Sequence, residues 1–393
     1  MFKTKKHPFL NVAHRELLHI STHWPYLFIT FVGPLLAFYL VMWIFSGSVP
    51  RDLPVAVVDL DHTAMSRQIV RMTDATPIAS VNRSFTSLQE ARVAMEKGKA
   101  DAILDIPNGT EKDILRGGSS NVALYLNNAN VLKGGLLNSG IKKALSTFSA
   151  GVKLQLKMKA GATQSQTMQQ IQPVMLRSEV LFNPFISYSY FLTSSLLPVM
   201  LIVFTLMGTT FAIGTEMQQG TGPQWLEMAD NNIFVALAGK IVPYTVIYFC
   251  VAMVMNVILF YSLGVPLRGN LHILLIAELL MIVSYQFLAI FLIGLFGNLR
   301  LGLSLGGAYT MMALTFSGLT YPIFGMPAVA QALAHIFPFT FWLKIFISQS
   351  LRGEPAANGL LPMLAFWLFM ALGALYIPRL KYVLLTRKFW GKI

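Results

Sequence analysis

Charged residues are scarce in this chain, and cysteine is almost absent. Asp, Glu, Lys and Arg make up 12% of the 393 residues, against about 25% in an average soluble domain. The single cysteine, Cys250, excludes an intrachain disulfide and a site built from several thiolates. The sequence also lacks the GxxxxGK(S/T) phosphate loop, so the chain has no nucleotide site of that type.

The charge that is present is concentrated in one part of the sequence. Residues 46–180 hold 16 of the 30 Lys and Arg residues and 11 of the 17 Asp and Glu residues. The remainder consists of long uncharged tracts, in a chain that is 55% hydrophobic. This layout is typical of membrane spans around one polar domain. The net charge of +13 forms no compact basic patch in the sequence, so we expect no nucleic-acid partner.

Six apolar tracts are long enough to cross a bilayer, which takes about 20 helical residues. Backbone groups inside a membrane must pair within their own segment, so each tract is predicted to be a helix. The predicted spans are Tyr26–Phe45, Tyr188–Gly214, Ile241–Leu263, Leu271–Gly297, Leu301–Thr320 and Leu360–Ile377. The first tract is too long for the apolar region of a signal peptide, and no A-x-A-like site follows it, so we expect it to be retained.

Basic residues flank the first and last tracts and predict the orientation. Lys and Arg favour the cytoplasmic side of a membrane, and both the N-terminal segment 1–25 and the tail 379–393 are basic. Six spans then place both termini in the cytoplasm and the polar residues 46–185 outside it. We therefore expect a multi-pass protein of the bacterial inner (plasma) membrane. The amphipathic stretch around Phe9–Ile20 is predicted to lie on the inner membrane surface.

Prolines interrupt the apolar stretch Tyr321–Phe346 at Pro322, Pro327 and Pro338. A proline in a helix interior costs about 3 kcal/mol, and a seventh full span would also move the basic tail outside. We expect a short re-entrant hairpin that enters from the outer face and is buried against protein. An interfacial loop is the alternative.

Residues 46–185 contain short alternating patterns typical of a small α/β domain. The predicted strands are Pro54–Val58, Ile78–Val81, Ala102–Ile106 and Val122–Leu126. The predicted helices are His62–Met72, Ser87–Lys97 and Val131–Met158. Pro173–Phe185 is expected to return the chain to the membrane. The predicted fold class is thus an α-helical integral membrane protein with six spans, a re-entrant hairpin and an inserted extracytoplasmic α/β domain.

A DxDxT motif that begins at Asp59 follows the first predicted strand. It resembles the nucleophile loop of haloacid-dehalogenase-type phosphatases, in which one carboxylate attacks phosphorus and the other handles a proton. A further pair of acids, Asp101 and Asp105, could supply magnesium ligands for such a site. Separately, His62 stands beside two acids and could bind a metal. The simpler interpretation is that Asp61 or Thr63 caps the following helix and Asp59 ends the strand. A five-residue motif is weak evidence for chemistry.

Four segments resemble permeases of the ABC-2 type, in the branch with a large extracytoplasmic domain between the first and second spans. They are Val55–Asp59 with Asp61 and Ser66, the GkxdaxlxIP-like stretch in Glu96–Pro107, the ExxxGT-like stretch Glu216–Thr221, and Phe316–Pro322 with Met326, Pro327 and Pro338. The similarity covers nearly the whole chain, in the family's order. One departure is Gly222–Leu226, which stands where such permeases continue with Leu, Glu and Arg-rich residues.

The resemblance implies a transport permease with no active site, metal or cofactor of its own. Its partners would be a cytoplasmic ATP-binding subunit that carries ATP and Mg, a second copy or a related permease, membrane lipid, and in some relatives a periplasmic adaptor. Residues 215–230 would be the coupling segment, with contacts to the ATP-binding subunit from Glu216, Gly220, Thr221 and Trp225. The segment Glu216–Asp230 carries three acids and no base, which favours a protein partner over a solvated connector.

Two ionisable residues in apolar surroundings are candidates for the substrate pathway. Glu278 lies about two turns into the fourth predicted span, and Lys344 lies in the re-entrant region. A carboxylate in hydrocarbon costs about 2.5–3.5 kcal/mol on insertion scales, so Glu278 is expected to face protein or water. The alternative role of Glu278 is a structural hydrogen bond to another helix. The predicted interface anchors are Trp24, Trp342 and Trp390.

Two other functions remain open. A proton-driven transporter would need paired ionisable residues within the membrane, and Glu278 is the one clear example. A membrane-anchored receptor or assembly factor would bind its partner through residues 46–185 and would need no ATP-binding subunit. The sequence does not name the substrate.

Overall fold

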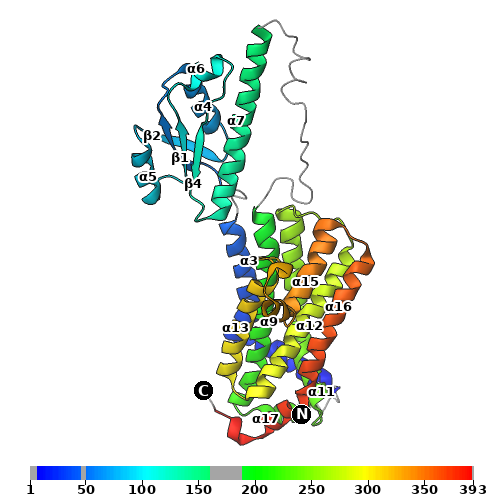
Figure 1. The fold of residues 1–393 in the computed structure, drawn as a ribbon. Coiled ribbons are helices and arrows are strands. Elements are labelled where there is room, and N and C mark those ends of the chain that lie inside the picture. The colour runs from blue at the N-terminus through cyan, green and yellow to red at the C-terminus, as the bar shows by residue number, and fades with distance from the viewer. Residues whose placement is uncertain (1–6, 46–49, 160–187, 392–393) are drawn as a thin grey trace. The chain divides into compact units, whose positions relative to one another are not determined.

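The computed structural model describes residues 7–45, 50–159 and 188–391, and the chain divides into two compact units (Figure 1). One unit comprises Met1–Ser48 and Val180–Ile393, and the other comprises Val49–Glu179. The predicted return segment Pro173–Phe185 lies outside the described residues, as do residues 1–6 of the N-terminal segment and residues 392–393 of the tail.

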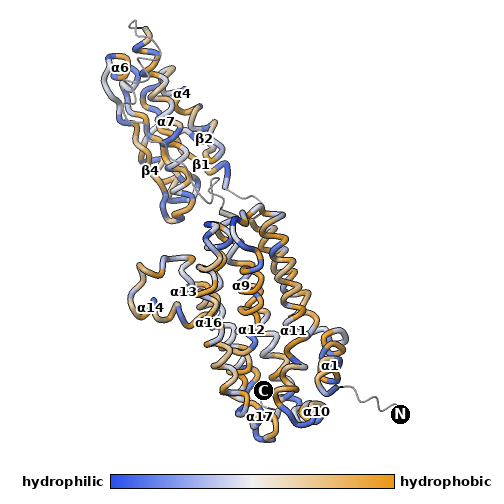
Figure 2. Tube along the Cα trace, turned by 90° about the vertical axis from the view of Figure 1, so that its right-hand side faces the viewer, coloured by the Kyte–Doolittle hydropathy of each residue, from blue (hydrophilic) through white to orange (hydrophobic). Residues whose placement is uncertain are grey.

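The first unit is a bundle of helices, and Figure 2 shows its long helices coloured mainly as hydrophobic. In chain order its elements are α1 Pro8–Thr22, α2 Trp24–Leu27, η1 Phe28–Val32, α3 Gly33–Ile44, α9 Tyr188–Gln218, α10 Gly222–Met228, α11 Ile233–Asn256, η2 Val257–Ser262, α12 Leu271–Phe296, α13 Leu299–Phe316, η3 Ile323–Gly325, α14 Ala328–Ala334, α15 Pro338–Phe346, η4 Ile347–Arg352, α16 Ala356–Leu375, α17 Ile377–Leu385 and η5 Arg387–Phe389.

Five continuous helical stretches in the described residues are long and apolar enough to cross a membrane. They are Trp24–Ile44, Tyr190–Gln218, Ile233–Ser262, Leu271–Phe296 and Ala356–Leu385. The predicted fifth span, Leu301–Thr320, is not among them. It forms the 18-residue helix α13, which is about 27 Å long, has Arg300 in its first turn and contains three glycines. The described helices thus support an α-helical membrane protein, while the number of six spans stays a prediction.

The re-entrant region contains two short helices at a sharp angle. Ala328–Ala334 and Pro338–Arg352 meet at 82°, and Figure 2 shows α14 away from the long helices of the bundle. The bend lies at Pro338, where proline begins the second helix. The pair can be counted either as a broken span or as a re-entrant loop. The second helix continues to Arg352, beyond the predicted limit at Phe346.

Asparagine and glycine set the helix ends that face the connecting loops. Asn232 and Asn270 accept hydrogen bonds from backbone N–H groups in the first turns of α11 and α12, and Asn298 does the same for α13. Each of these side chains satisfies donors that a helix leaves unpaired at its start. Gly297 ends α12 with a φ of +57°, a left-handed conformation that favours glycine.

Helix α12 is central to the bundle, because it contacts α9, α11, α13, α15, α16 and α17. Short helices gather at one end of the bundle, where α10 contacts α1, α9, α11 and α17 (Figure 2). A separate apolar cluster forms there, and it includes Val12, Trp225, Ile293 and Leu384. Part of the predicted tail is therefore packed against the bundle, since Leu380 and Leu384 of α17 are buried.

The second unit is an α/β fold with a four-stranded sheet. Its elements are β1 Leu53–Asp59, α4 Ala64–Asp74, β2 Ala79–Phe85, α5 Leu88–Glu96, β3 Ala102–Ile106, α6 Thr110–Leu115, β4 Ala123–Leu126 and α7 Val131–Lys159. The strand order is β2-β1-β3-β4, and only β4 is antiparallel to its neighbour. Val55 and Val57 face one apolar cluster and Ala56 and Val58 face another, as expected of a central strand buried on both faces.

Candidate functional site

Four charged side chains meet where α1, α9 and α11 pack together. Lys240 Nζ lies 2.6 Å from Glu16 Oε1 and 2.9 Å from Glu216 Oε1. Arg15 Nη2 lies 2.8 Å from the same oxygen of Glu216. The exposed fractions are 0% for Glu16, 1% for Lys240, 3% for Glu216 and 19% for Arg15. We call Arg15, Glu16, Glu216 and Lys240 the buried charge cluster.

The buried charge cluster is neutral overall, and every carboxylate oxygen in it has a donor. The Tyr244 hydroxyl donates to Glu16 Oε2 at 3.4 Å, and the Thr221 hydroxyl donates to Glu216 Oε2. Removing an ion from water costs several kcal/mol, and this cost is offset only when the remaining lone pairs are also satisfied. The complete set of donors explains how two acids can be buried here.

A glycine allows α1 to lie directly on α11. The buried face of α1 presents Val12, Glu16 and Ile20 at four-residue spacing. A Cβ atom on Gly239 of α11 would lie 2.7 Å from Val12 Cβ, closer than carbon atoms pack. Since Gly239 has no Cβ, the two helices approach closely enough for Glu16 to reach Lys240.

The chain turns sharply between α9 and α10, next to the buried charge cluster. Glu216 lies in the last turn of α9, and its carbonyl accepts the Thr221 N–H at 2.9 Å. Gly220 has a φ of +70°, which favours glycine. A Cβ on Gly220 would lie 2.9 Å from the Trp390 ring. The C-terminal segment therefore packs against this turn and fixes its position.

The predicted coupling residues hold this segment in place rather than face solvent. Glu216 and Trp225 are buried, and Trp225 lies beneath Lys240, whose Nζ is 4.8 Å from the ring centroid. The exposed residues of the segment are Gln219, Gln224, Glu227 and Asp230. The two charged residues exposed on this segment, Glu227 and Asp230, are both acidic, and we call this side the acidic surface.

An open hollow lies beside this acidic surface. It has a volume of about 410 Å³ and is lined by Asn11, His14, Arg15, Leu18, His19 and Met228. Burial lowers the pKa of His19 below its ordinary value, although Glu16 opposes this shift. His19 is therefore held mainly neutral near pH 7, which leaves Arg15 as the cation that reaches from the hollow into the cluster.

Glu278 forms a hydrogen bond between two helices. It is fully buried, and its Oε2 accepts a hydrogen bond from Asn256 Nδ2 on α11 at 2.7 Å. This arrangement matches the structural role considered for Glu278 as an alternative to substrate contact. A polar pair between helices is the usual way to accommodate such a residue in an apolar bundle.

Lys344 faces a hollow at the re-entrant region. It is exposed on α15, and its Nζ lies 5.5 Å from the Phe341 ring centroid. The hollow has a volume of about 450 Å³, and its lining also includes His335, Gln331 and Phe324. Lys344 therefore stands where a molecule could reach it, whereas Glu278 does not.

The prediction that Trp342 anchors the membrane interface was wrong. Trp342 is fully buried, with ring centroids 5.9 Å from Phe339 and 5.1 Å from Phe346. Because α15 packs against α12 and α16, its inner face lies within protein. Trp24 is 64% exposed, as an anchor must be. Trp390 is partly covered by the turn that it packs against.

The second acid of the DxDxT motif accepts hydrogen bonds from its own fold. Asp61 accepts from the backbone N–H groups of Gly109 and Glu111 at 2.8 Å and 3.1 Å, and from the Thr63 hydroxyl at 2.7 Å. Burial alone would raise the pKa of Asp61, but these hydrogen bonds outweigh it and lower the pKa. Thr63 is the cap of α4, as one alternative predicted, while Asp61 fastens the start of α6 instead.

Two other acids near the motif, Asp59 and Asp101, are also engaged within the domain, whereas Asp105 has a buried Oδ1 without a hydrogen-bond partner in the part of the chain that the structure describes. Asp59 accepts a hydrogen bond from the Ser66 hydroxyl at 2.7 Å, and Asp101 pairs with Lys133 at 3.2 Å. Within the described ranges, no three His, Cys, Asp or Glu side chains group together to hold a metal ion. The geometry thus favours the capping interpretation of the motif over phosphatase chemistry.

Sequence reasoning missed the partners of Glu216. The sequence patterns singled out none of Arg15, Glu16 and Lys240 as a partner for it. A signal was available, because Lys240 stands eighth in the apolar helix α11, where an unpaired ammonium is costly. The position of Lys240 indicates that an acid from another segment is buried against it, but the sequence does not indicate which acid.

Residues 24–377 match the family described as ABC-2 family transporter protein. Two similar proteins are named "Probable multidrug ABC transporter permease YbhS", one from Escherichia coli strain K12 and one from Escherichia coli O157:H7. Each is 22% identical over 307 residues, which cover 76% of this chain and 74% of the relative.

Proposed function

Because the chain belongs to the ABC-2 family of transporter proteins, we propose that it is the membrane-spanning permease subunit of an ATP-driven exporter. The observation that carries the proposal is the buried charge cluster, which ties the amphipathic helix α1 to the ends of two long helices. ATP and Mg would be held by a separate subunit. The permease would move substrate out of the cytoplasm or the inner membrane.

The ATP-binding subunit would dock on the acidic side of the coupling segment. Three of its exposed residues, Gln224, Glu227 and Asp230, lie on and just after the short helix α10. This helix contacts α1, α9, α11 and α17, so a displacement of α10 by the bound subunit would be passed directly to four helices of the bundle. Charge complementarity of this kind guides partners into register.

The buried charge cluster would transmit movement of α10 to the spans. Thr221, just before α10, donates to Glu216, and Trp225 on α10 packs under Lys240. We expect α10 and the ends of α9 and α11 to move together as one body. Separating them would break an ion pair and leave a charge buried and unpaired. In this scheme the predicted residues Glu216, Gly220, Thr221 and Trp225 couple the subunits by positioning the docking surface.

The proposal includes the expected topology and assembly. Both termini would lie in the cytoplasm of a bacterial cell, and the α/β unit would lie on the opposite side of the inner membrane. Two permease copies, or one copy and a related permease, would form the pathway within membrane lipid. A periplasmic adaptor could then bind the α/β unit.

The substrate pathway would pass Lys344 rather than Glu278. Lys344 lines an open hollow, whereas Glu278 is buried in a hydrogen bond. The relatives' name refers to multidrug transport. A hollow lined by apolar side chains together with Lys344, His335 and Gln331 would suit amphipathic small molecules.

Purification in mild detergent tests the docking surface. The protein should carry an ATPase with it, and Glu227→Lys combined with Asp230→Asn should remove that ATPase without changing the elution of the permease. Asn keeps the positive φ of Asp230 acceptable. The control is Glu96→Lys, which makes the same charge reversal on an exposed residue of the α/β unit.

If the ATPase still co-purifies with the double variant, the coupling segment is not the docking surface. A wild-type protein that carries no ATPase at all would favour the receptor or assembly factor, because that function needs no motor.

A further inference from the structure

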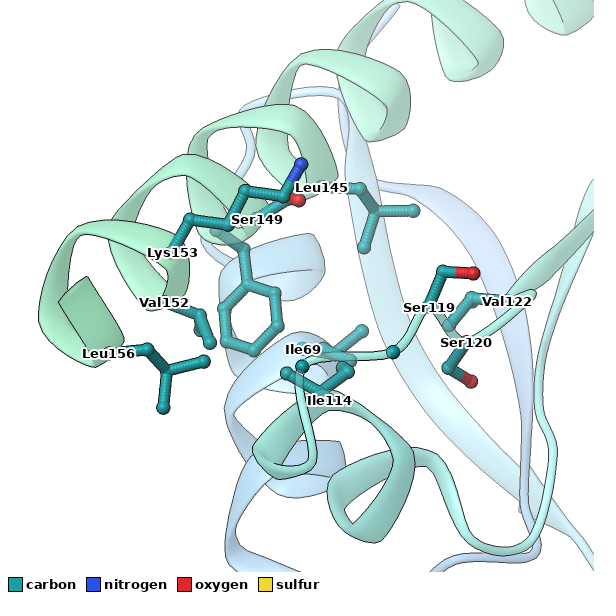
Figure 3. Close-up of a pocket in the computed structure, with 13 residues that line it drawn as sticks. Ile69, Ile114, Ser119, Ser120, Val122, Leu145, Ser149, Val152, Lys153 and Leu156 are labelled. Carbon is teal, nitrogen blue, oxygen red and sulfur yellow. The ribbon is translucent and has the colours of Figure 1, made fainter. Parts of the chain in front are cut away.

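The α/β unit contains a cavity that the transport proposal does not use. It has a volume of about 370 Å³ and lies between α4, α6, α7 and the loop before β4 (Figure 3). Ligand sites for small molecules usually measure about 300–1,000 Å³. The cavity is therefore large enough for one compact ligand or one apolar chain.

The apolar wall of the cavity comes mainly from one stripe of α7. Leu145, Val152 and Leu156 lie on the same face of that helix, and Figure 3 shows them turned toward Ile69 and Ile114 across the space. The first part of α7 covers the sheet, where Leu137 and Ile141 are buried. Val152 and Leu156 continue the stripe but remain partly exposed, so their apolar surface is left facing the cavity.

Small residues keep the opposite wall open. The loop after α6 reads Gly117, Gly118, Ser119 and Ser120, and a Cβ atom on Gly117 would meet nothing within 4 Å. Gly117 also has a φ of +79°, so the turn itself favours glycine. The loop therefore passes the apolar stripe without filling the space.

The polar groups of the cavity lie at its rim and carry one sign of charge. Lys153 and Ser149 project from α7, and Ser119 and Ser120 lie on the facing loop (Figure 3). No acidic residue is among the described residues that line the cavity. An apolar interior beside one ammonium group and several hydroxyls is complementary to an apolar chain that ends in an anion.

We propose that this cavity binds an anionic amphiphile with a single apolar chain, such as a free fatty-acid-type carboxylate. The chain lies along the stripe of Val152 and Leu156, and the carboxylate pairs with Lys153 at the rim. The hydroxyls of Ser119 and Ser149 offer further hydrogen bonds to the carboxylate. This binding site is independent of the ATP-driven export proposed above.

Photolabelling of the full-length protein in lipid nanodiscs tests the proposal. The probe is dodecanoate that carries a diazirine on its chain, and labelled positions are located by mass spectrometry. Label should appear on the α7 peptide that contains residues 145–156. Unlabelled competitors should act in order of chain length, because each buried methylene tightens binding about fourfold.

Three variants separate the apolar chain from the charge. Val152→Trp places an indole ring where the apolar chain would lie and should reduce labelling by about tenfold. Lys153→Gln should remove the preference for dodecanoate over dodecanol, which an exposed ion pair would set at about two- to fivefold. Lys143→Gln makes the same substitution at an exposed position of α7 outside the cavity, and it should label as wild type does.

Hydrogen exchange of strands β1 to β4 shows whether each variant is folded. If Val152→Trp unfolds the domain, Lys153→Gln still tests the proposal, because it changes an exposed residue. Equal labelling of dodecanoate and dodecanol in the wild type would overturn the proposal. So would label that is insensitive to both cavity variants.

Discussion

Replacing Lys240 with methionine should release α1 from the bundle. Methionine keeps most of the side-chain length and the apolar contact with Trp225, but it removes the ammonium group that lies within 3 Å of two carboxylates. Two negative charges would then face one positive charge, that of Arg15. Glu16 suffers most, because it is fully buried and would keep only the Tyr244 hydroxyl at 3.4 Å.

The size of this effect follows from the burial of the partners. Removing one member of a buried ion pair costs about 3–5 kcal/mol, because the other charge stays buried without compensation. At about 1.4 kcal/mol for each factor of ten, the opening equilibrium of α1 should shift by about 150-fold or more. An exposed ion pair would change it by about fivefold or less.

Hydrogen–deuterium exchange on the detergent-solubilised protein measures this equilibrium directly. Peptides covering Pro8–Thr22 should exchange at least two orders of magnitude faster in Lys240→Met, while α12 and α16 stay protected. Lys388→Met is the matched control, because Lys388 is an exposed lysine of the same helical unit. It should leave the exchange of α1 unchanged.

A double variant separates unpaired charge from a general loss of packing. Glu16→Gln combined with Lys240→Met removes one charge of each sign and leaves the pair of Arg15 and Glu216. The double variant should exchange more slowly than Lys240→Met alone, with a coupling energy of about 0.5–3 kcal/mol. Wild-type exchange in Lys240→Met, or additive losses in the double variant, would show that the ion pairs do not hold α1.

Three further predictions concern other parts of the chain. Gly220→Ala should lower stability by about 1–2 kcal/mol in thermal unfolding, because its φ of +70° is strained for alanine and the new Cβ meets the Trp390 ring; an unchanged unfolding temperature would contradict this. Asp61→Asn should speed exchange in α6 at pH 7. The pKa of Asp61 is lowered in the fold. The stabilisation that Asp61 provides is therefore complete above its unfolded pKa of about 3.9 and is lost as the pH falls through the lower folded pKa. The ratio of variant to wild-type exchange rates should approach one at low pH, and a ratio that does not change with pH would contradict this linkage. Glu278→Gln should transport normally and unfold near the wild-type temperature, because glutamine can still accept the hydrogen bond from Asn256 on α11. Glu278→Ala should lower the free energy of unfolding by about 1–3 kcal/mol. Loss of transport in the glutamine variant would restore Glu278 to the substrate pathway.

Much of the bundle could be predicted because a membrane restricts what a sequence can do. Hydrocarbon requires long apolar helices with internally paired backbones, so the tracts at Tyr26, Tyr188, Ile241 and Leu271 foretold helices that the structure contains. The 18-residue helix α13 was harder to assign, because Arg300 and its glycines lower its apolar character. In the α/β unit, strand and turn patterns lay close to the observed elements, since each is a local property.

The candidate site depended on information that the sequence does not carry locally. Glu16 and Lys240 are 224 residues apart, and neither residue's neighbours indicate the other. Trp342 was assigned to the membrane interface because its sequence context is apolar, yet α15 turns it into the protein. A helix that is apolar on all sides, such as α12, gives no periodic signal of which face meets which neighbour.

By itself, the sequence determined that this chain is a helical membrane protein with a polar α/β insertion, and its motifs resembled one transporter family over nearly the whole length. Only the tertiary structure decided that Glu216 is buried between Arg15 and Lys240, and that the exposed acids of the coupling segment are Glu227 and Asp230. The physical reason is that hydrophobicity and backbone pairing act within a segment, whereas the partner of a buried charge is chosen by how separate helices pack.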